Sequence, residues 1–147
     1  MKKGNIANVG DNNVNDLMVK LGLGKVKDKL KSDIDDHVSY AVIELNSPKE
    51  QKAKLHTGSD DSIQVWLNGK SVQRVELNRA AANYQEKKDI TLKQGKNILM
   101  VAIYEKGGGW SMFVGMEGKF TAAGKKYPQG GGDGNIDIAG DKITGPW

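Results

Sequence analysis

Two adjacent carboxylates, Asp60 and Asp61, are the residues of this sequence best suited to hold a metal ion. Ca²⁺ takes about six to eight hard oxygen ligands, and adjacent carboxylates with nearby carbonyl and amide oxygens supply them. The pair also follows Gly58 and Ser59, and Asp side chains accept backbone hydrogen bonds in turns. Asp60 and Asp61 are therefore either a calcium site or a plain turn between two strands.

A second acidic stretch, GGGDGNIDIAGD, lies near the C-terminal end of the sequence. If Gly134 is aligned with the invariant glycine of an EF-hand loop, Gln129 and Gly131 fall where carboxylate or amide ligands belong. Gly140 then stands in place of the bidentate Glu. Most EF-hand ligands are missing, so the stretch is interpreted as a linker or as a calcium site of another kind.

Three tryptophans, Trp66, Trp110 and Trp147, are candidates for stacking on a sugar, because an exposed indole face packs on the C–H face of a pyranose. Trp66 alternates out of phase with the apolar residues of 63–67, so it should project from the opposite face of its strand. Trp110 follows three glycines, and it either contacts a ligand or anchors the last strand in the core.

Polar residues that could accompany such a ring are Asn68, Arg79 and Tyr84. Arg79 is one of only two arginines, and its guanidinium suits either the carboxylate of an acidic sugar or an internal partner such as Asp60 or Asp61. The internal ion pair is the favoured alternative. The separate roles of Asn68 and Tyr84 do not follow from the sequence.

Composition excludes several classes of function. There is no Cys, which removes disulfides, Cys-ligated zinc and thiolate catalysis. His37 and His56 lack the spacing of a zinc-binding pair, and no P-loop or GxSxG motif occurs, so we expect no enzyme activity. The net charge is only +4, carried mainly by scattered Lys, so nucleic acid is not an expected partner. The sequence has no long apolar run, so membrane insertion is not expected.

Alternating and apolar segments predict strands over 38–45, 51–57 and 62–67. Asn68-Gly69 indicates a type I′ turn, because both of its central residues need positive φ, and residues 70–77 should return antiparallel. Further strands are expected over 89–92, 98–104 and 110–116.

The remaining segments carry weaker patterns. Residues 78–88 are expected to form a loop, and residues 93–97 a turn. Residues 17–30 alternate Lys with apolar residues around two Gly, which favours strand and loop over helix. Short strands at spacings near ten residues predict a single all-β sandwich over residues 1–122. A Gly-rich tail over 123–147 would hold one candidate strand.

The stretch LHTGSDDSIQVWLNGKSV, followed by NRAAANYQEKKDITLKQGKNILMVAIYEKGGGWSMFVGME, resembles galactose-binding-like jelly-roll modules of bacterial secreted proteins. The resemblance covers Ser39 to Phe120 and implies an antiparallel jelly-roll β-sandwich. It is less specific for ligand, since such modules include carbohydrate binders, calcium-stabilised spacers and domains with no known ligand.

The pair Asp60-Asp61 is also similar to the paired-aspartate loop of anthrax protective-antigen-like lectin domains. In those domains two neighbouring carboxylates hold a calcium ion that coordinates sugar hydroxyls. This resemblance is confined to the one loop and implies calcium at Asp60 and Asp61.

Together these patterns predict a non-catalytic carbohydrate-binding module that binds a polysaccharide or glycan. The resemblance implies a secreted or cell-surface bacterial protein. The alternative is a structural spacer or protein-interaction domain with no soluble ligand. The sequence ends on Gly145, Pro146 and Trp147, which suggests a piece of a larger multidomain protein.

Overall fold

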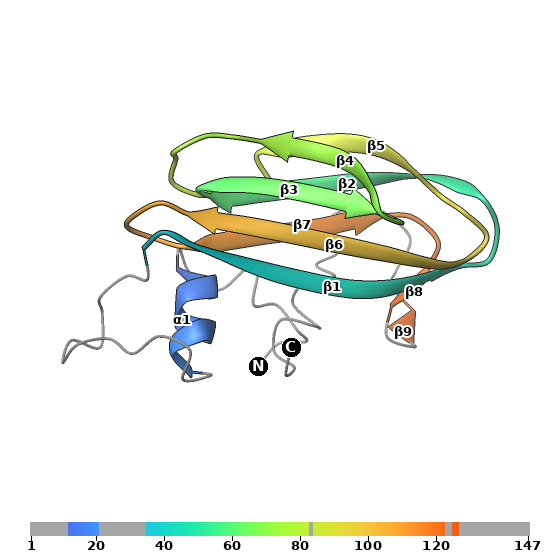
Figure 1. The fold of residues 1–147 in the computed structure, drawn as a ribbon. Helices are drawn as coiled ribbons and strands as arrows, with labels where there is room; N and C mark the ends of the chain where they lie inside the picture. The colour runs from blue at the N-terminus through green and yellow to red at the C-terminus, as the bar shows by residue number, and fades with distance from the viewer. Residues whose placement is uncertain (1–11, 21–34, 83, 123–124, 127–147) are drawn as a thin grey trace.

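The computed structural model describes residues 12–20, 35–82, 84–122 and 125–126. These residues form two antiparallel sheets packed face to face, with a short helix beside one end (Figure 1). The six-stranded sheet has the order β4-β3-β6-β1-β8-β9, and the three-stranded sheet has the order β5-β2-β7. The predicted antiparallel β-sandwich is therefore confirmed.

The elements, in chain order, are α1 (Asn13–Lys20), β1 (His37–Ser47), β2 (Gln51–Asp60), β3 (Ser62–Leu67), β4 (Lys70–Val75), β5 (Glu86–Leu92), β6 (Gly95–Glu105), β7 (Ser111–Glu117), β8 (Thr121–Ala122) and β9 (Lys125–Lys126). β9 pairs with β8, so strand pairing continues beyond the predicted domain boundary at residue 122. The rest of the predicted tail, with its GGGDGNIDIAGD stretch and Trp147, lies outside the described residues.

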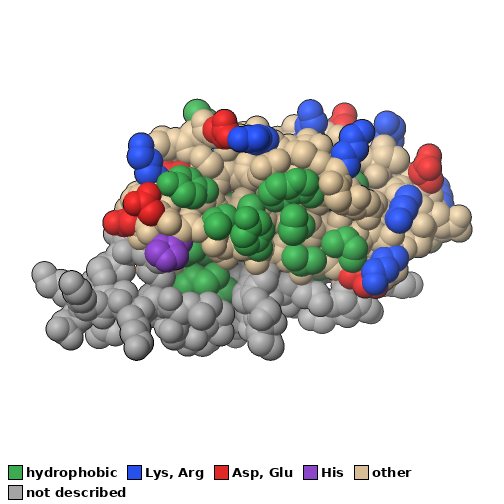
Figure 2. Space-filling model, in the orientation of Figure 1, with side chains coloured by type: hydrophobic (Ala, Val, Ile, Leu, Met, Phe, Trp, Pro, Cys, Tyr) green, Lys and Arg blue, Asp and Glu red, His purple; other side chains and the backbone are tan. Residues whose placement is uncertain are grey.

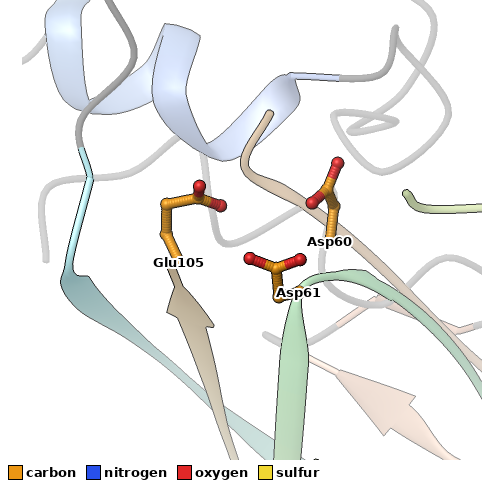
Figure 3. Close-up of side chains that lie close together, drawn as sticks. All are labelled: Asp60, Asp61 and Glu105. Carbon is orange, nitrogen blue, oxygen red and sulfur yellow. The ribbon is translucent and has the colours of Figure 1, made fainter. Parts of the chain in front are cut away.

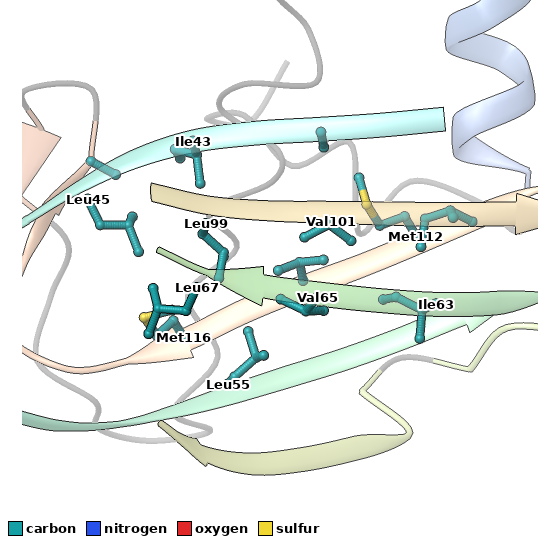
Figure 4. Close-up of a cluster of buried hydrophobic side chains, with 14 of the residues drawn as sticks. Ile43, Leu45, Leu55, Ile63, Val65, Leu67, Leu99, Val101, Met112 and Met116 are labelled. Carbon is teal, nitrogen blue, oxygen red and sulfur yellow. The ribbon is translucent and has the colours of Figure 1, made fainter. Parts of the chain in front are cut away.

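The core lies between the sheets because alternate residues of each strand point inward. Ile63, Val65 and Leu67 of β3 are buried and face residues of β2 and β7 such as Leu55 and Met116 (Figure 4). β6 contributes Leu99, Val101 and Ile103 in the same phase. The alternation also fixes which residues point outward, and this decides where Trp66 lies.

The Asn68-Gly69 turn joins β3 to β4 as predicted, and both residues have positive φ, 52° and 80°. The Asn68 side chain donates to Asn97 Oδ1 at 3.0 Å and accepts from the Ile98 backbone at 2.9 Å. Buried Asn97 also bonds the backbone of Lys93, so two turns are tied together. Asn68 therefore has a structural role at its end of the sandwich.

Several predictions about elements were wrong. Residues 86–88, expected as loop, belong to β5 because they pair with β2, and residues 95–97, expected as a turn, belong to β6 because they pair with β1. Residues 17–20, predicted as strand and loop, belong to α1, because Val14, Leu17 and Met18 at helical spacing pack on the core beside β7. The helical stripe begins before Leu17, outside the segment from which the strand was predicted.

β2 also continues through Gly58 to Asp60 instead of ending at Thr57, because residues 54–60 pair with β7 along their whole length. Ala82, Tyr84 and Gln85 lie against the outer side of Gly58, and a Cβ at Gly58 would overlap the carbonyl oxygen of Ala82. Glycine is needed there for close approach and not for a turn. Among the described residues no helix is long and apolar enough to cross a membrane.

Candidate functional site

Three carboxylates meet where β2 ends and β3 begins. Asp60 ends β2, Asp61 joins the two strands across a cis peptide bond, and Glu105 ends β6. One oxygen of each lies within 4.8 Å of the others (Figure 3). The exposed fractions are 9% for Asp60, 2% for Asp61 and 0% for Glu105. The three carboxylates thus form a buried acidic cluster at one end of the sandwich.

Backbone amides hold Asp61 in place. Its Oδ1 accepts from the Arg79 N–H at 2.8 Å, and its Oδ2 accepts from the Lys106 N–H at 3.0 Å. Its own N–H donates to the Tyr104 carbonyl at 3.2 Å, beside Glu105. These two backbone donors fix the orientation of the Asp61 carboxyl beside the other two acids.

The donor set fits a hard divalent cation. All three side chains offer oxygen, which suits Ca²⁺ or Mg²⁺ and not a metal that prefers nitrogen or sulfur. Three carboxylates, each able to bind through one or two oxygens, would supply much of the coordination that Ca²⁺ needs. When ionised, they also repel one another strongly at this separation in a poorly solvated site, and a cation would relieve that repulsion.

Arg79 lies beside the cluster, but its charge is used elsewhere. The guanidinium forms an ion pair with Glu86, with Nη2 at 2.9 Å from Oε2, and donates to the carbonyl and hydroxyl oxygens of Ser59. The predicted internal ion pair therefore exists, with Glu86 in place of Asp60 or Asp61. The hydrogen bond from Arg79 to Asp61 comes from its backbone N–H. Its side chain links β2 to β5 through Ser59 and Glu86, so the guanidinium is engaged within the fold and is not directed at a ligand.

Tyr84 packs edge-on against His56, with ring centroids 5.7 Å apart and an interplanar angle of 76°. His56 Nε2 lies 2.6 Å from Glu117 Oε1 on β7. These residues occupy the outer side of the three-stranded sheet. Tyr84 and Asn68 are therefore apart from each other, and neither adds a ligand atom to the acidic cluster.

The two tryptophans within the described residues differ. Trp110 is only 2% exposed and its indole N–H donates to the Ile103 carbonyl at 3.4 Å, so it belongs to the core and offers no face for stacking. Trp66 is partly exposed on the outer face of the six-stranded sheet, as its alternation predicts. Of the five proposed sugar contacts, Trp66 alone has an aromatic face on an open sheet surface.

Glu105 was missed as a member of the site. The sequence pattern could have indicated Glu105. It continues the inward-facing alternation of Leu99, Val101 and Ile103, which puts a charged residue at a core-facing position. Buried charges are rare unless they are paired or bind a metal. The partner loop could not be found from the sequence because Glu105 is far along the chain from Asp61.

No family model and no curated protein matches the sequence. Among solved structures, the PA14 domain of the MpAFP antifreeze protein is similar over 78% of this chain and 55% of that chain, with TM-score 0.54 and 14% identity. An anti-sigma factor domain-containing protein is similar over 71% and 35%, with TM-score 0.51 and 15% identity. A PA14 sugar-binding domain from an RTX adhesin covers 65% and 55%, with TM-score 0.47 and 16% identity.

These likenesses concern the fold. The chain has a β-sandwich like that of the antifreeze protein's PA14 domain. It covers between 35% and 55% of the lengths of the three chains. None of the three is described as a galactose-binding-like module, so that resemblance stays a prediction.

Proposed function

We propose that this chain is a non-catalytic carbohydrate-binding module whose Asp60, Asp61 and Glu105 hold a calcium ion. The observation that carries the proposal is the convergence of three buried carboxylates within 4.8 Å at the β2–β3 junction. The PA14-like fold and the partly exposed ring of Trp66 support a glycan as the ligand. Such a module belongs in a secreted or cell-surface protein.

The calcium ion would act mainly by shaping the module. Asp60 belongs to the three-stranded sheet and Glu105 to the six-stranded sheet, so an ion between them joins the two layers. The chain's own residues then set the geometry, because the amides of Arg79 and Lys106 orient Asp61 and the end of β6 carries Glu105.

The test is a binding screen on glycan arrays and insoluble polysaccharides with the full chain, run with added calcium and with chelator. We expect retention by at least one glycan and, by calorimetry, a calcium-binding site that Glu105→Gln removes. Asp89→Asn is the matched control, because Asp89 is an exposed acid on β5 that pairs with Lys54 and does not belong to the cluster. If the chain binds a glycan but calorimetry detects no calcium binding, the calcium site is refuted and the carbohydrate-binding function is retained.

A spacer or protein-interaction domain is the second candidate, and the burial of the cluster favours it specifically. Carboxylates that are 0% to 9% exposed leave little room for a sugar hydroxyl on the metal. Calcium binding with no retention on any glycan would therefore select the spacer, with calcium as a structural ion.

A further inference from the structure

The outer face of the six-stranded sheet carries an aromatic and apolar surface, which we call the platform. It is formed by outward-pointing side chains of the neighbouring strands β4, β3, β6 and β1 (Figure 2). These side chains include Val38, Tyr40, Val42, Ser62, Gln64, Trp66, Arg74, Met100, Ala102 and Tyr104. Strand register places them in rows: Tyr40 lies opposite Ala102, and Ala102 opposite Gln64, while Val42, Met100 and Trp66 form the next row. Tyr40 is 51% exposed and Tyr104 is 42% exposed. Large apolar residues this exposed on one face mark a binding surface.

The platform contains a hollow of about 380 Å³, with Tyr40, Trp66, Tyr104, Ala102, Gln64 and Arg74 among its lining residues. Ala102 has only a methyl group between the longer side chains of Tyr40 and Gln64, so the surface dips there. Hollows of a few hundred cubic ångströms suit small ligands. The Tyr104 ring is held in place, because its hydroxyl donates to Asp36 Oδ1 at 3.1 Å.

The two charged side chains that line the hollow, Arg74 and Glu76, form an ion pair with each other. Arg74 Nε donates to Glu76 at 2.9 Å, and Lys96 lies 2.7 Å from Glu44 on the neighbouring strand. The lining of the hollow therefore offers rings and hydrogen-bonding groups with no excess of either charge, which complements a neutral ligand and not an acidic one.

The platform adjoins the acidic cluster but faces another way. Tyr104 and Ser62 of the platform are chain neighbours of Glu105 and Asp61, and the Asp61 N–H donates to the Tyr104 carbonyl. Alternation turns Glu105 inward and Tyr104 outward. An ion at the cluster would thus fix one end of the platform without touching a ligand on it.

We propose that the platform binds a neutral polysaccharide chain laid across the six-stranded sheet. Tyr40, Trp66 and Tyr104 stack on the C–H faces of successive sugar rings, while Gln64 and Arg74 donate to hydroxyls. This inference rests on the proposed carbohydrate function and names its surface and ligand class.

The experiment measures affinity electrophoresis of the full chain in gels containing neutral polysaccharides (β-glucan, mannan, xylan) or acidic ones (alginate, polygalacturonate). We expect retardation by a neutral polysaccharide. Tyr40→Ala and Trp66→Ala should each weaken it at least tenfold with unchanged melting temperature. Tyr40→Phe should retain most of it, and Lys52→Ala on the other sheet should have no effect. Tyr40 is half exposed, so its variant reports binding even if Trp66 variants fold poorly.

The other outcomes overturn the inference in distinguishable ways. Retention that survives Tyr40→Ala but is lost in Asp61→Asn places the glycan at the metal and leaves the carbohydrate function standing. Retention by acidic polysaccharides alone refutes the neutral ligand. A dimer in light scattering that Tyr40→Ala dissociates assigns the platform to a second copy of the chain. If no polysaccharide retards the chain, both the proposed carbohydrate-binding function and the assignment of the platform as its binding surface are refuted.

Discussion

At the scale of single residues, the two arginines of this chain allow a direct comparison of a largely buried ion pair and an exposed one. Arg79 bonds Glu86 and two oxygens of Ser59, and its side chain is 17% exposed. Arg74 bonds Glu76 with both side chains more than 60% exposed. The value of an ion pair depends on solvent screening and on the number of hydrogen bonds that a substitution leaves unmade.

Arg79→Lys should therefore destabilise the fold, because an ammonium cannot reproduce the fork toward Glu86 and Ser59. We expect a loss of about 1–3 kcal/mol in the free energy of unfolding, measured by denaturant titration. Arg74→Lys is the matched control and should change it by less than about 0.5 kcal/mol. Equal effects of the two substitutions would show that Arg79 does not brace β2 against β5.

Tyr104 should titrate late. Its hydrogen bond to Asp36 raises the pKa of the phenol above the ordinary value of 10.0, and burial and the charges of Asp36, Asp61 and Glu105 add to the rise. Because the folded-state pKa is raised, the stabilising contact is present at neutral pH and is lost as pH climbs through the raised value.

The ultraviolet absorbance of phenolate, with Tyr104→Phe to assign the signal, measures this titration. Asp36→Gly should bring the pKa of Tyr104 back toward the ordinary range, since glycine accepts the positive φ of 54° at that position. An unchanged titration curve in Asp36→Gly would contradict the hydrogen bond.

At the scale of elements, the close approach of Ala82 and Tyr84 to β2 depends on Gly58. Gly58→Ala would drive a methyl group into the Ala82 carbonyl, so the segment that carries Arg79 must move. We expect a loss of about 1–3 kcal/mol in the free energy of unfolding and faster proteolysis within 78–85. Gly107→Ala is the control, because the nearest atom to its added Cβ would be 3.9 Å away, and it should leave both measurements unchanged. Equal proteolysis of the two variants would contradict the close approach at Gly58.

Elements whose pattern is local were predictable from the sequence. The β3–β4 hairpin follows from the alternation of 63–67 and the Asn68-Gly69 turn, and β6 from its long apolar run. The last residues of β2 were not predictable, because Gly58, Ser59 and Asp60 have turn-forming side chains and become strand only by pairing with β7. Arg79 and Glu105 show the same limit, since their partners are chosen by tertiary packing.

At the scale of the whole molecule, the candidate ion would link the two sheets. Asp60 lies in the three-stranded sheet and Glu105 in the six-stranded sheet, and the unfolded chain keeps these groups far apart. A ligand that binds only the folded state stabilises it by about 2.7 kcal/mol at one hundred times its Kd. The sandwich as a unit, and not one loop, should therefore respond to calcium.

We expect calcium to raise the Tm by roughly 5–10 °C at that saturation, and chelator to reverse the rise. Removing the ligand on either sheet, by Asp60→Asn or by Glu105→Gln, should abolish most of the shift, whereas Asp89→Asn should keep it. Scanning calorimetry with near-ultraviolet circular dichroism distinguishes a shift of the whole transition from a local one. A shift that persists in Asp60→Asn would mean that the ion does not bridge the sheets, and no shift in the unmodified chain would leave the three carboxylates without a metal.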